Sequence, residues 1–325
     1  MLPSVKDFLE KYRGKRIFFE PLWGNNGDTL IKLGTLVALR RAKVVQVRRP
    51  DEADLILING SGGMSPLWGG IRVLDAYSKK YPDIPLAVLP SSWNYNKSEM
   101  ENLFKMRHSP CFLYARERYS YQLLQDLGYI PDVKIGLDHD MAFRLAESEL
   151  IASLHRVGGL KHNLFVERKD RESVGDIQQE LHRIMSMMRW IIPKKIRHAL
   201  PDSVRLRLYD IFIPFERLLN TRRLGKMDVG SPLARRFIYI LQRKHPEFKD
   251  LPIFSADISL KEVMSFSNFC LVIANAAVVF TTRLHVGILG ALLGKIVYLK
   301  SGNWHKIRGV YEFSLKDNIN VVWLP

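Results

Sequence analysis

The 325 residues exceed what one ordinary hydrophobic core holds and predict two domains of roughly 150 residues each. A hydrophobic content of 47% excludes a disordered chain, and two cysteines without metal-ligand spacing predict reduced, buried thiols in a cytosolic protein. The formal net charge of +16 predicts an anionic neighbour, which is nucleic acid, an acidic lipid surface or a phosphorylated substrate.

The N-terminal half alternates strands, polar or glycine-rich loops, and helices. We expect strands over 16–22, 44–47, 53–59, 86–89, 112–115 and 133–137, and helices over 29–42, 68–81, 98–106 and 121–128. This alternation predicts a parallel sheet with helices on both faces. Residues 1–7 lack the charged start and apolar core of a signal peptide.

The glycine-rich loop at 24–28 follows the first strand. Its glycines are spaced Gly-x-x-Gly rather than Gly-x-Gly-x-x-Gly, which disfavours NAD binding. Asp28 or Thr29 is expected to cap the following helix. Asn26 and Asp28 either serve only the turn and the cap or line a cleft and touch a substrate hydroxyl.

Other polar residues follow later strands of this half. The loop Gly60–Gly63 is mostly glycine, so its backbone amides can approach a ligand. Arg116 follows the strand at 112–115, where it either binds a ligand or pairs with Glu117. Asp140 follows the strand at 133–137, which again places acidic chemistry at a strand end.

The C-terminal half resumes the same pattern. We expect strands over 163–166, 253–254, 277–280, 296–299 and 321–324, and helices over 260–269 and 286–293. The longest apolar stretch, 269–280, is about 12 residues long, whereas a bilayer-spanning helix needs about 20. We therefore expect a chain that does not cross a membrane.

Arg283 and His285 lie where the strand at 277–280 leads into a helix. Open α/β sheets bind ligands at this point, and the unpaired N–H groups of a helix start favour an anion. A guanidinium and an imidazole here indicate a phosphate or carboxylate substrate handled by an acid or base; the alternative is a loop cap and an ordinary histidine. Arg116 occupies the equivalent place in the first half, so the two arginines are predicted to face each other across a cleft.

A basic insertion interrupts the second half over about residues 176–246. Between 161 and 245 the chain has 19 Lys and Arg against 9 Asp and Glu, so +10 of the net +16 lies there. Segments 188–197 and 206–215 mix aromatic and aliphatic residues with basic ones, a pattern typical of helices that lie on anionic membranes. The alternative is a helical insertion packed on the body; nucleic acid is disfavoured because no recognised binding module accompanies the charge.

Six short segments, taken in order and spacing, resemble the polysaccharide pyruvyl transferase family: Gly24–Asp28, Gly60–Gly63, Ala115–Ser120, Asp140–Phe143, Thr282–His285 and His305–Lys306. The resemblance covers about residues 15–145 and 250–315 and leaves the basic insertion unmatched. The chain departs from the family pattern at Thr282, where serine is usual, at Ser61, which interrupts a glycine run, and at Met141, where proline is common.

The resemblance implies two Rossmann-like domains of the GT-B type around a central cleft, over 1–150 and 151–325. It also implies transfer of pyruvate from phosphoenolpyruvate to a sugar as a cyclic ketal, with no metal and no cofactor. Such polysaccharides are built on polyprenyl-diphosphate carriers, so the expected acceptor is lipid-linked and the expected location is cytoplasmic, at the membrane face, with the basic insertion on the anionic surface.

Several side chains fit this chemistry. Arginine matches both the carboxylate and the phosphate of phosphoenolpyruvate, so Arg116 and Arg283 are the expected donor ligands, with Lys306 as a point charge on the phosphate. Histidine titrates near neutral pH, so His285 is the expected general acid that protonates the methylene carbon, with His305 as the alternative.

The remaining site residues are expected around the donor and the acceptor. Gly62 is expected to contact the donor, Asn26 to contact the acceptor, and Asp28 or Asp140 to deprotonate its hydroxyl. Two other functions stay open at this point. They are a GT-B glycosyltransferase using a nucleotide sugar, for which no acidic pair is visible late in the chain, and a non-catalytic membrane scaffold.

Overall fold

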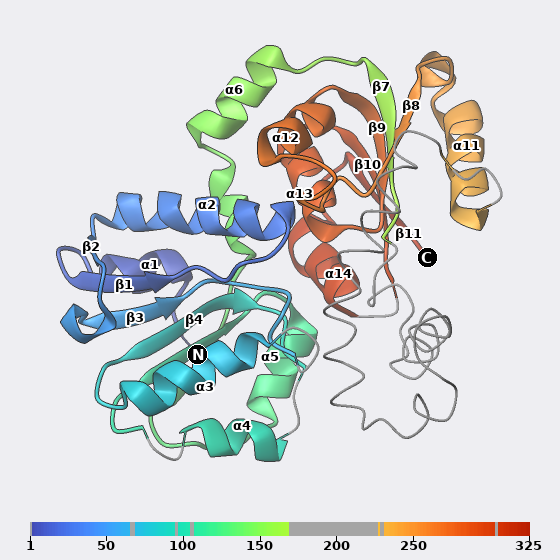
Figure 1. Ribbon diagram of the computed structural model, residues 1–325. Coiled ribbons are helices and arrows are strands. Elements are labelled where there is room, and N and C mark those ends of the chain that lie inside the picture. Colours follow the sequence, from blue (N-terminus) through green and yellow to red (C-terminus); the bar gives the residue numbers. More distant parts are fainter. Residues whose placement is uncertain are drawn as a thin grey trace, which may run out of the picture.

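The computed structural model describes residues 2–65, 69–94, 97–104, 107–168, 227, 231–302 and 305–325. It contains two parallel sheets, one of six and one of five strands (Figure 1). We call the part built on the six-stranded sheet the first domain and the part built on the five-stranded sheet the second domain. The predicted pair of parallel-sheet α/β domains is confirmed.

The first sheet has the strand order β2-β1-β3-β4-β5-β6. Its strands are β1 (Arg16–Glu20), β2 (Val45–Val47), β3 (Leu55–Ile58), β4 (Leu86–Ser91), β5 (Cys111–Ala115) and β6 (Val133–Leu137). One face packs on α1 (Val5–Glu10) and α2 (Asn26–Ala42), and the other on α3 (Gly70–Lys80), α4 (Lys97–Phe104) and α5 (Arg118–Gln125). Short 3₁₀ turns lie at Pro50–Glu52 and Met141–Leu145.

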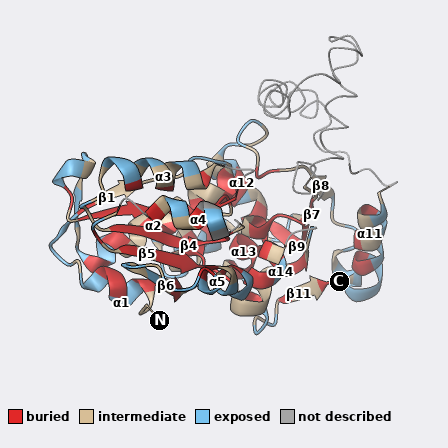
Figure 2. Cartoon of the chain, turned by 90° about the horizontal axis from the view of Figure 1, so that it is seen from below, coloured by how far each residue is buried: buried red, intermediate tan, exposed pale blue. Residues whose placement is uncertain are grey.

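Strand β3 shows why this sheet needs helices on both sides. All four of its residues are apolar and fully buried. Successive side chains of a strand point to opposite faces. Leu55 and Leu57 accordingly join the core under α1 and α2, and Ile56 and Ile58 join the core under α3, α4 and α5. Figure 2 shows the buried strands of the first sheet between helices whose outer sides are exposed.

The second sheet has the order β11-β10-β9-β7-β8. Its strands are β7 (His162–Val166), β8 (Ile253–Ser255), β9 (Ala276–Thr281), β10 (Ile296–Lys300) and β11 (Val321–Leu324). One face packs on α6 (Glu149–Val157), α12 (Phe266–Ala274), α13 (Leu284–Leu292) and α14 (His305–Val310), and the other on α11 (Pro232–Lys244). A 3₁₀ turn lies at Pro246–Phe248 and a π-helical turn at Tyr311–Leu315.

In each sheet that the structure describes, successive strands are added first on one side of the initial strand and then on the other. In the first sheet, β2 and β3 lie on opposite sides of β1, and in the second, β8 and β9 lie on opposite sides of β7. Loops leaving such neighbouring strands diverge, which opens a crevice at their carboxyl ends. The fold therefore predicts ligand sites after β1 and β3 and after β7 and β9.

The start of α2 connects the two domains. Asn26 donates its backbone N–H to Ser259 O at 2.8 Å and its side-chain amide to Ile258 O at 3.0 Å. Leu30, one turn later, is buried in the core that α12 and α13 form in the second domain. In Figure 1 the same helix reaches from the first sheet to α13. The carboxyl ends of the two sheets are thus held next to each other.

Three predicted helix starts are wrong; the helix expected over 121–128 spans Arg118–Gln125, and capping explains the other two. Helix α2 begins at Asn26 and its N-cap is Asn25, whereas Asp28 is the third helical residue and completes a capping box. The helix expected over 260–269 begins only at Phe266, because the Ser265 side chain accepts the Asn268 N–H and caps it there. Residues 260–264 are thereby left in the loop before the helix.

Most of the basic insertion expected over 176–246 lies outside the described residues, apart from Met227 and the segment from 231 onward. The domain boundary expected at 150 falls within α6, which packs on α12. None of the helices that the structure describes combines the length and apolarity required to cross a membrane.

Candidate active site

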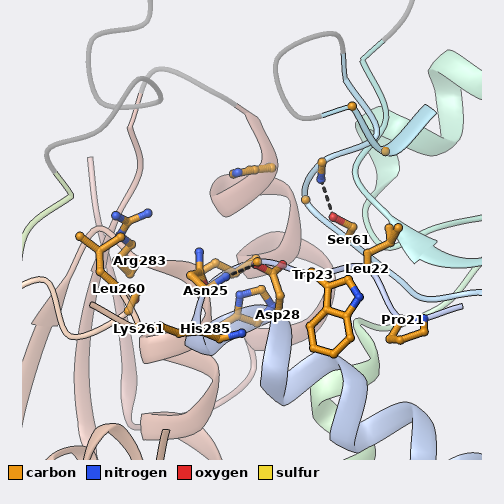
Figure 3. A pocket seen from close by; sticks show the side chains of 18 of the residues that line it. Pro21, Leu22, Trp23, Asn25, Asp28, Ser61, Leu260, Lys261, Arg283 and His285 are labelled. Carbon is orange, nitrogen blue, oxygen red and sulfur yellow. Dashed lines mark hydrogen bonds between the residues drawn. The ribbon is translucent and has the colours of Figure 1, made fainter. Parts of the chain in front are cut away.

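A pocket of about 420 Å³ lies between the carboxyl ends of the two sheets (Figure 3). The first domain lines it with the loops that follow β1, β3 and β5. The second domain lines it with residues that follow β7, β8 and β9 and with the start of α14. The pocket thus lies where the two reversals in strand order predict a ligand.

Arg116 and Lys306 converge on Gly62 in this pocket. Arg116 is 1% exposed, and it donates from Nε to Ser92 Oγ at 2.9 Å and from Nη1 to Asp140 Oδ2 at 2.7 Å. A Cβ atom built on Gly62 would lie 2.9 Å from Arg116 Nη2 and 3.3 Å from Lys306 Nζ. Two cationic nitrogens therefore surround a space that the absence of a side chain keeps open, which is suited to an anion.

The Gly62 loop is held by its serine. The Ser61 hydroxyl accepts the Gly63 N–H at 2.8 Å, and the Ser61 N–H donates to Ser91 Oγ at 3.1 Å. Ser61, which interrupts the glycine run of the family pattern, thus fixes the turn without filling the space beside Gly62.

His285 is paired with a buried carboxylate. Its Nε2 lies 3.4 Å from Asp140 Oδ2, the oxygen that also accepts from Arg116. Burial by itself raises the pKa of Asp140, but the nearby His285, the charge of Arg116 and the N–H of Ala142 outweigh it and lower this pKa well below its usual range. Asp140 therefore remains ionised beside the imidazole.

The first turn of α2 supports the other side of the imidazole. A Cβ atom on Gly27 would lie 2.5 Å from His285 Nδ1 and 2.8 Å from His285 Cβ. Only glycine permits this approach. The close contact places the histidine of the second domain directly against a helix of the first, and the labelled His285 and Asp28 of Figure 3 show the same meeting of the two domains.

Arg283 is oriented by an aspartate. Its Nε donates to Asp257 Oδ1 at 3.0 Å and its Nη2 donates to Asp257 Oδ2, which makes a bidentate pair. The Thr281 hydroxyl accepts the Arg283 backbone N–H at 2.9 Å. The pairing fixes the guanidinium and offsets its charge, so Arg283 attracts an anion less strongly than an arginine without a carboxylate.

Most of the predicted site residues come together. Arg116 and Arg283, one from each domain, line the same pocket, as do Gly62, Asp28, His285 and Lys306. Asp28 is held to the start of α2, where its Oδ2 accepts the Asn25 N–H at 2.8 Å.

Three predicted residues lie elsewhere. Asn26 is fully buried and bonded to carbonyls of the second domain, so it connects domains rather than contacting an acceptor. Asp140 is also fully buried, between Arg116 and His285, and its geometry does not support a direct contact with the acceptor. His305 is outside the pocket lining; its Nε2 lies 3.8 Å from Glu117 Oε1 and its ring packs near Tyr119.

Several residues of the site were missed by sequence reasoning, and four of them lie at or near strand ends in the structure. Glu20, Arg168 and Asp257 come at or just after β1, β7 and β8, and Ser92 follows β4. Arg168 lines the pocket, and its N–H donates to Thr282 Oγ1 at 2.7 Å. A position near a strand end, the signal that found Arg116 and Arg283, was available for Arg168, Asp257 and Ser92, whereas Glu20 lies inside the strand expected over 16–22. Across the described part of the chain, no cluster of three or more His, Cys, Asp or Glu side chains is arranged to hold a metal ion.

Comparison with known proteins identifies the fold and the family. A structure solved for a functionally uncharacterized protein from Klebsiella pneumoniae subsp. pneumoniae NTUH-K2044 is 17% identical, with a TM-score of 0.61 over 98% of this chain and 96% of the other. That similarity shows a shared fold. A search by sequence among curated proteins finds no match. The family model for polysaccharide pyruvyl transferase matches residues 3–298, most of the chain. The protein is therefore a transferase and belongs to the polysaccharide pyruvyl transferase family.

Proposed function

We propose that this protein transfers the pyruvyl group of phosphoenolpyruvate to two hydroxyls of one sugar in a glycan precursor, forming a cyclic ketal. The observation that carries the proposal is the convergence of Arg116, His285 and Lys306 on one pocket, with Asp140 buried behind them. With His285 protonated, these four groups carry a net charge of about +2, which suits a small polyanion. In this proposal the two domains face the pocket in the manner of GT-B enzymes.

The donor phosphate binds beside Gly62 in this mechanism. Arg116 and Lys306 both direct a nitrogen to that space. Arg283, which Asp257 holds by two hydrogen bonds, then attracts the carboxylate end with a partly offset charge. Arranging donors before the reaction lets them stabilise charge without reorganising.

His285 acts as the general acid. In this proposal the imidazolium of His285, with Nε2 3.4 Å from Oδ2 of the ionised Asp140, carries the proton that is donated. That proton moves to the methylene carbon of phosphoenolpyruvate, and C2 becomes an oxocarbenium-like centre. One sugar hydroxyl then bonds to C2, the C2–O bond to phosphate breaks, and the second hydroxyl closes the ring. One hydroxyl proton restores His285 and the other leaves on inorganic phosphate, so the atoms and charges balance.

Donor binding and turnover test this function separately. Phosphoenolpyruvate, and not a nucleotide sugar, should raise the melting temperature of the full chain. With a panel of lipid-linked oligosaccharides, phosphate release should accompany a mass gain on the glycan. His285→Gln should lose turnover by a factor of about 10² to 10⁴ while phosphoenolpyruvate still stabilises the protein. Stabilisation by nucleotide sugars alone would instead support a glycosyltransferase, and full turnover by His285→Gln would refute the assigned acid.

We extend the proposal to a polyprenyl-diphosphate-linked acceptor at the cytoplasmic face of a membrane. The net charge of +16 and the basic composition of residues 161–245 support attraction to anionic lipid. Flotation with anionic liposomes should show binding that weakens as salt is raised and that disappears when residues 186–224 are removed. Unchanged partitioning after that deletion would contradict the membrane contact.

A further inference from the structure

The walls of the pocket differ in chemistry. Arg116, Lys306 and Arg283 contribute cationic groups to its lining. The end of β1 contributes Glu20, and the segment between β1 and α2 contributes Trp23. A carboxylate repels an anionic donor, whereas it accepts hydrogen bonds from the hydroxyls of a neutral sugar.

Glu20 is held in place by a tyrosine of α3. The Tyr77 hydroxyl donates to Glu20 Oε2, and burial followed by this hydrogen bond raises the pKa of Tyr77, so the phenol remains a donor at any working pH. Among the described residues, the Glu20 side chain accepts a hydrogen bond from Tyr77 alone, and it does so through Oε2. The second carboxylate oxygen, Oε1, is therefore available to a ligand in the pocket.

Trp23 exposes a large aromatic surface at the same wall. Its side chain is 79% exposed although it lines the pocket. Lys32 Nζ lies 4.9 Å from the ring centroid and covers one face of the indole, which leaves the opposite face for an apolar partner. The C–H face of a pyranose is such a partner, because its hydroxyls point outward while its ring hydrogens pack on the indole. Figure 3 shows Trp23 and Asp28 on the segment that enters α2, and Arg283 on the opposite domain.

We propose that Trp23 and Glu20 form the subsite for the acceptor sugar, with Trp23 stacked on the ring and Glu20 as the base for the attacking hydroxyl. This inference rests on the proposed function. Asp28 is the less suitable base, because its carboxylate already serves the capping box of α2. Tyr77 is a positioning residue that holds Glu20.

The protons of the two sugar hydroxyls leave by different routes. The hydroxyl oxygen supplies the electron pair of its new bond to C2, and its proton moves to Glu20. When the C2–O bond to phosphate breaks, Glu20 returns this proton to the departing phosphate. The proton of the second hydroxyl restores His285, which had given its own to the methylene carbon.

The test measures the Kd of phosphoenolpyruvate, the KM of the acceptor and kcat, all in the full chain. The probes are phosphoenolpyruvate and a panel of methyl glycosides of galactose, glucose, mannose, N-acetylglucosamine and N-acetylmannosamine. Saturation-transfer NMR in the presence of phosphoenolpyruvate should show contact at ring C–H protons in the wild type and lose it in Trp23→Ala. For the glycoside that turns over, Trp23→Ala should raise the acceptor KM about tenfold. Glu20→Gln should lower kcat by a factor of about 10² to 10⁴ and remove the acidic limb of the pH profile, which a base that must be deprotonated produces. Neither change should alter the Kd of phosphoenolpyruvate by more than about twofold.

Two control variants change similar side chains away from the pocket. Tyr129→Ala removes an aromatic side chain that is 91% exposed before β6, and Glu52→Gln neutralises an exposed carboxylate before β3, both at the amino ends of strands. Both should match the wild type in every parameter. Tyr77→Phe should shift the pH profile and lower kcat less than Glu20→Gln does.

The outcomes separate the subsite from the function. A wild type that fails to bind phosphoenolpyruvate refutes the proposed function. A wild type that binds phosphoenolpyruvate but none of the glycosides contradicts the subsite. Equal acceptor KM in Trp23→Ala and wild type, or full kcat in Glu20→Gln, also overturns the assignment while leaving the donor chemistry intact.

Discussion

Replacing Gly62 with alanine tests the anion site directly. The added methyl group would lie 2.9 Å from Arg116 Nη2 and 3.3 Å from Lys306 Nζ, where a donor oxygen is expected. Both contacts are with the ends of long side chains, and Gly62 is not among the glycines with positive φ. We therefore expect the free energy of unfolding to change by less than about 1 kcal/mol.

The Gly62→Ala substitution should instead weaken the binding of phosphoenolpyruvate. Losing one charge-assisted hydrogen bond of about 1.5–3 kcal/mol raises the Kd of phosphoenolpyruvate by roughly 10- to 150-fold. Isothermal titration calorimetry measures this Kd, and a thermal melt without ligand measures the fold. Gly159→Ala is the matched control, since a Cβ atom there meets nothing closer than 3.5 Å. A Gly62→Ala variant that binds phosphoenolpyruvate within twofold of the wild type would refute the placement of the anion.

Two further variants address the histidine and the buried ion pair, and a labelling experiment addresses the thiols. Gly27→Ala places a methyl 2.5 Å from His285 Nδ1, so initial rates of phosphate release should fall at least about tenfold while donor affinity persists. Asp140→Asn leaves the buried Arg116 without its carboxylate and should lower the free energy of unfolding in urea by about 3–5 kcal/mol. Because the folded pKa of Asp140 is lowered, its stabilisation is present above the unfolded pKa of about 4 and is lost as pH falls toward the folded value, so the difference from Asp140→Asn should narrow in melts below about pH 4. Burial raises the pKa of both cysteine thiols to about 12, so Ellman's reagent at pH 8 should label neither until the protein is unfolded.

Much of the fold could be predicted because the strands are short and almost entirely apolar. Strands such as β3 and β9 are buried on both faces, and their apolar runs are bounded by polar or glycine residues. The start of α2 was misplaced because Asn25 and Asp28 are both good capping residues, and only the structure shows that Asn25 is the cap and Asp28 its reciprocal partner. Local sequence does not decide between two such candidates.

Part of the candidate site could be predicted from residues that lie at strand ends, and part, such as Lys306, only from the family resemblance. Arg116 and Arg283 were found by their position at strand ends, and both line the pocket. The pairing of Arg283 with Asp257 depends on strand order, because β8 lies beside β7 and not beside β9. That order is a tertiary property, so the partner that offsets the charge of Arg283 was not visible in the sequence. The burial of Asp140 behind His285 likewise requires the second domain to be in place.

The helix that enters the second domain limits how the enzyme can work through a reaction cycle. Separating the two lobes would remove Leu30 from the core of the second domain, which costs about 1.5–3 kcal/mol for this side chain. It would also break the hydrogen bonds that the Asn26 amide donates to the carbonyls of Ile258 and Met264. A hinge motion that separates the two lobes is therefore unfavourable, so we expect reactants to enter and leave through the opening of a pocket that is already formed. Turnover should then depend on diffusion through that opening and on chemistry, rather than on gating by lobe closure.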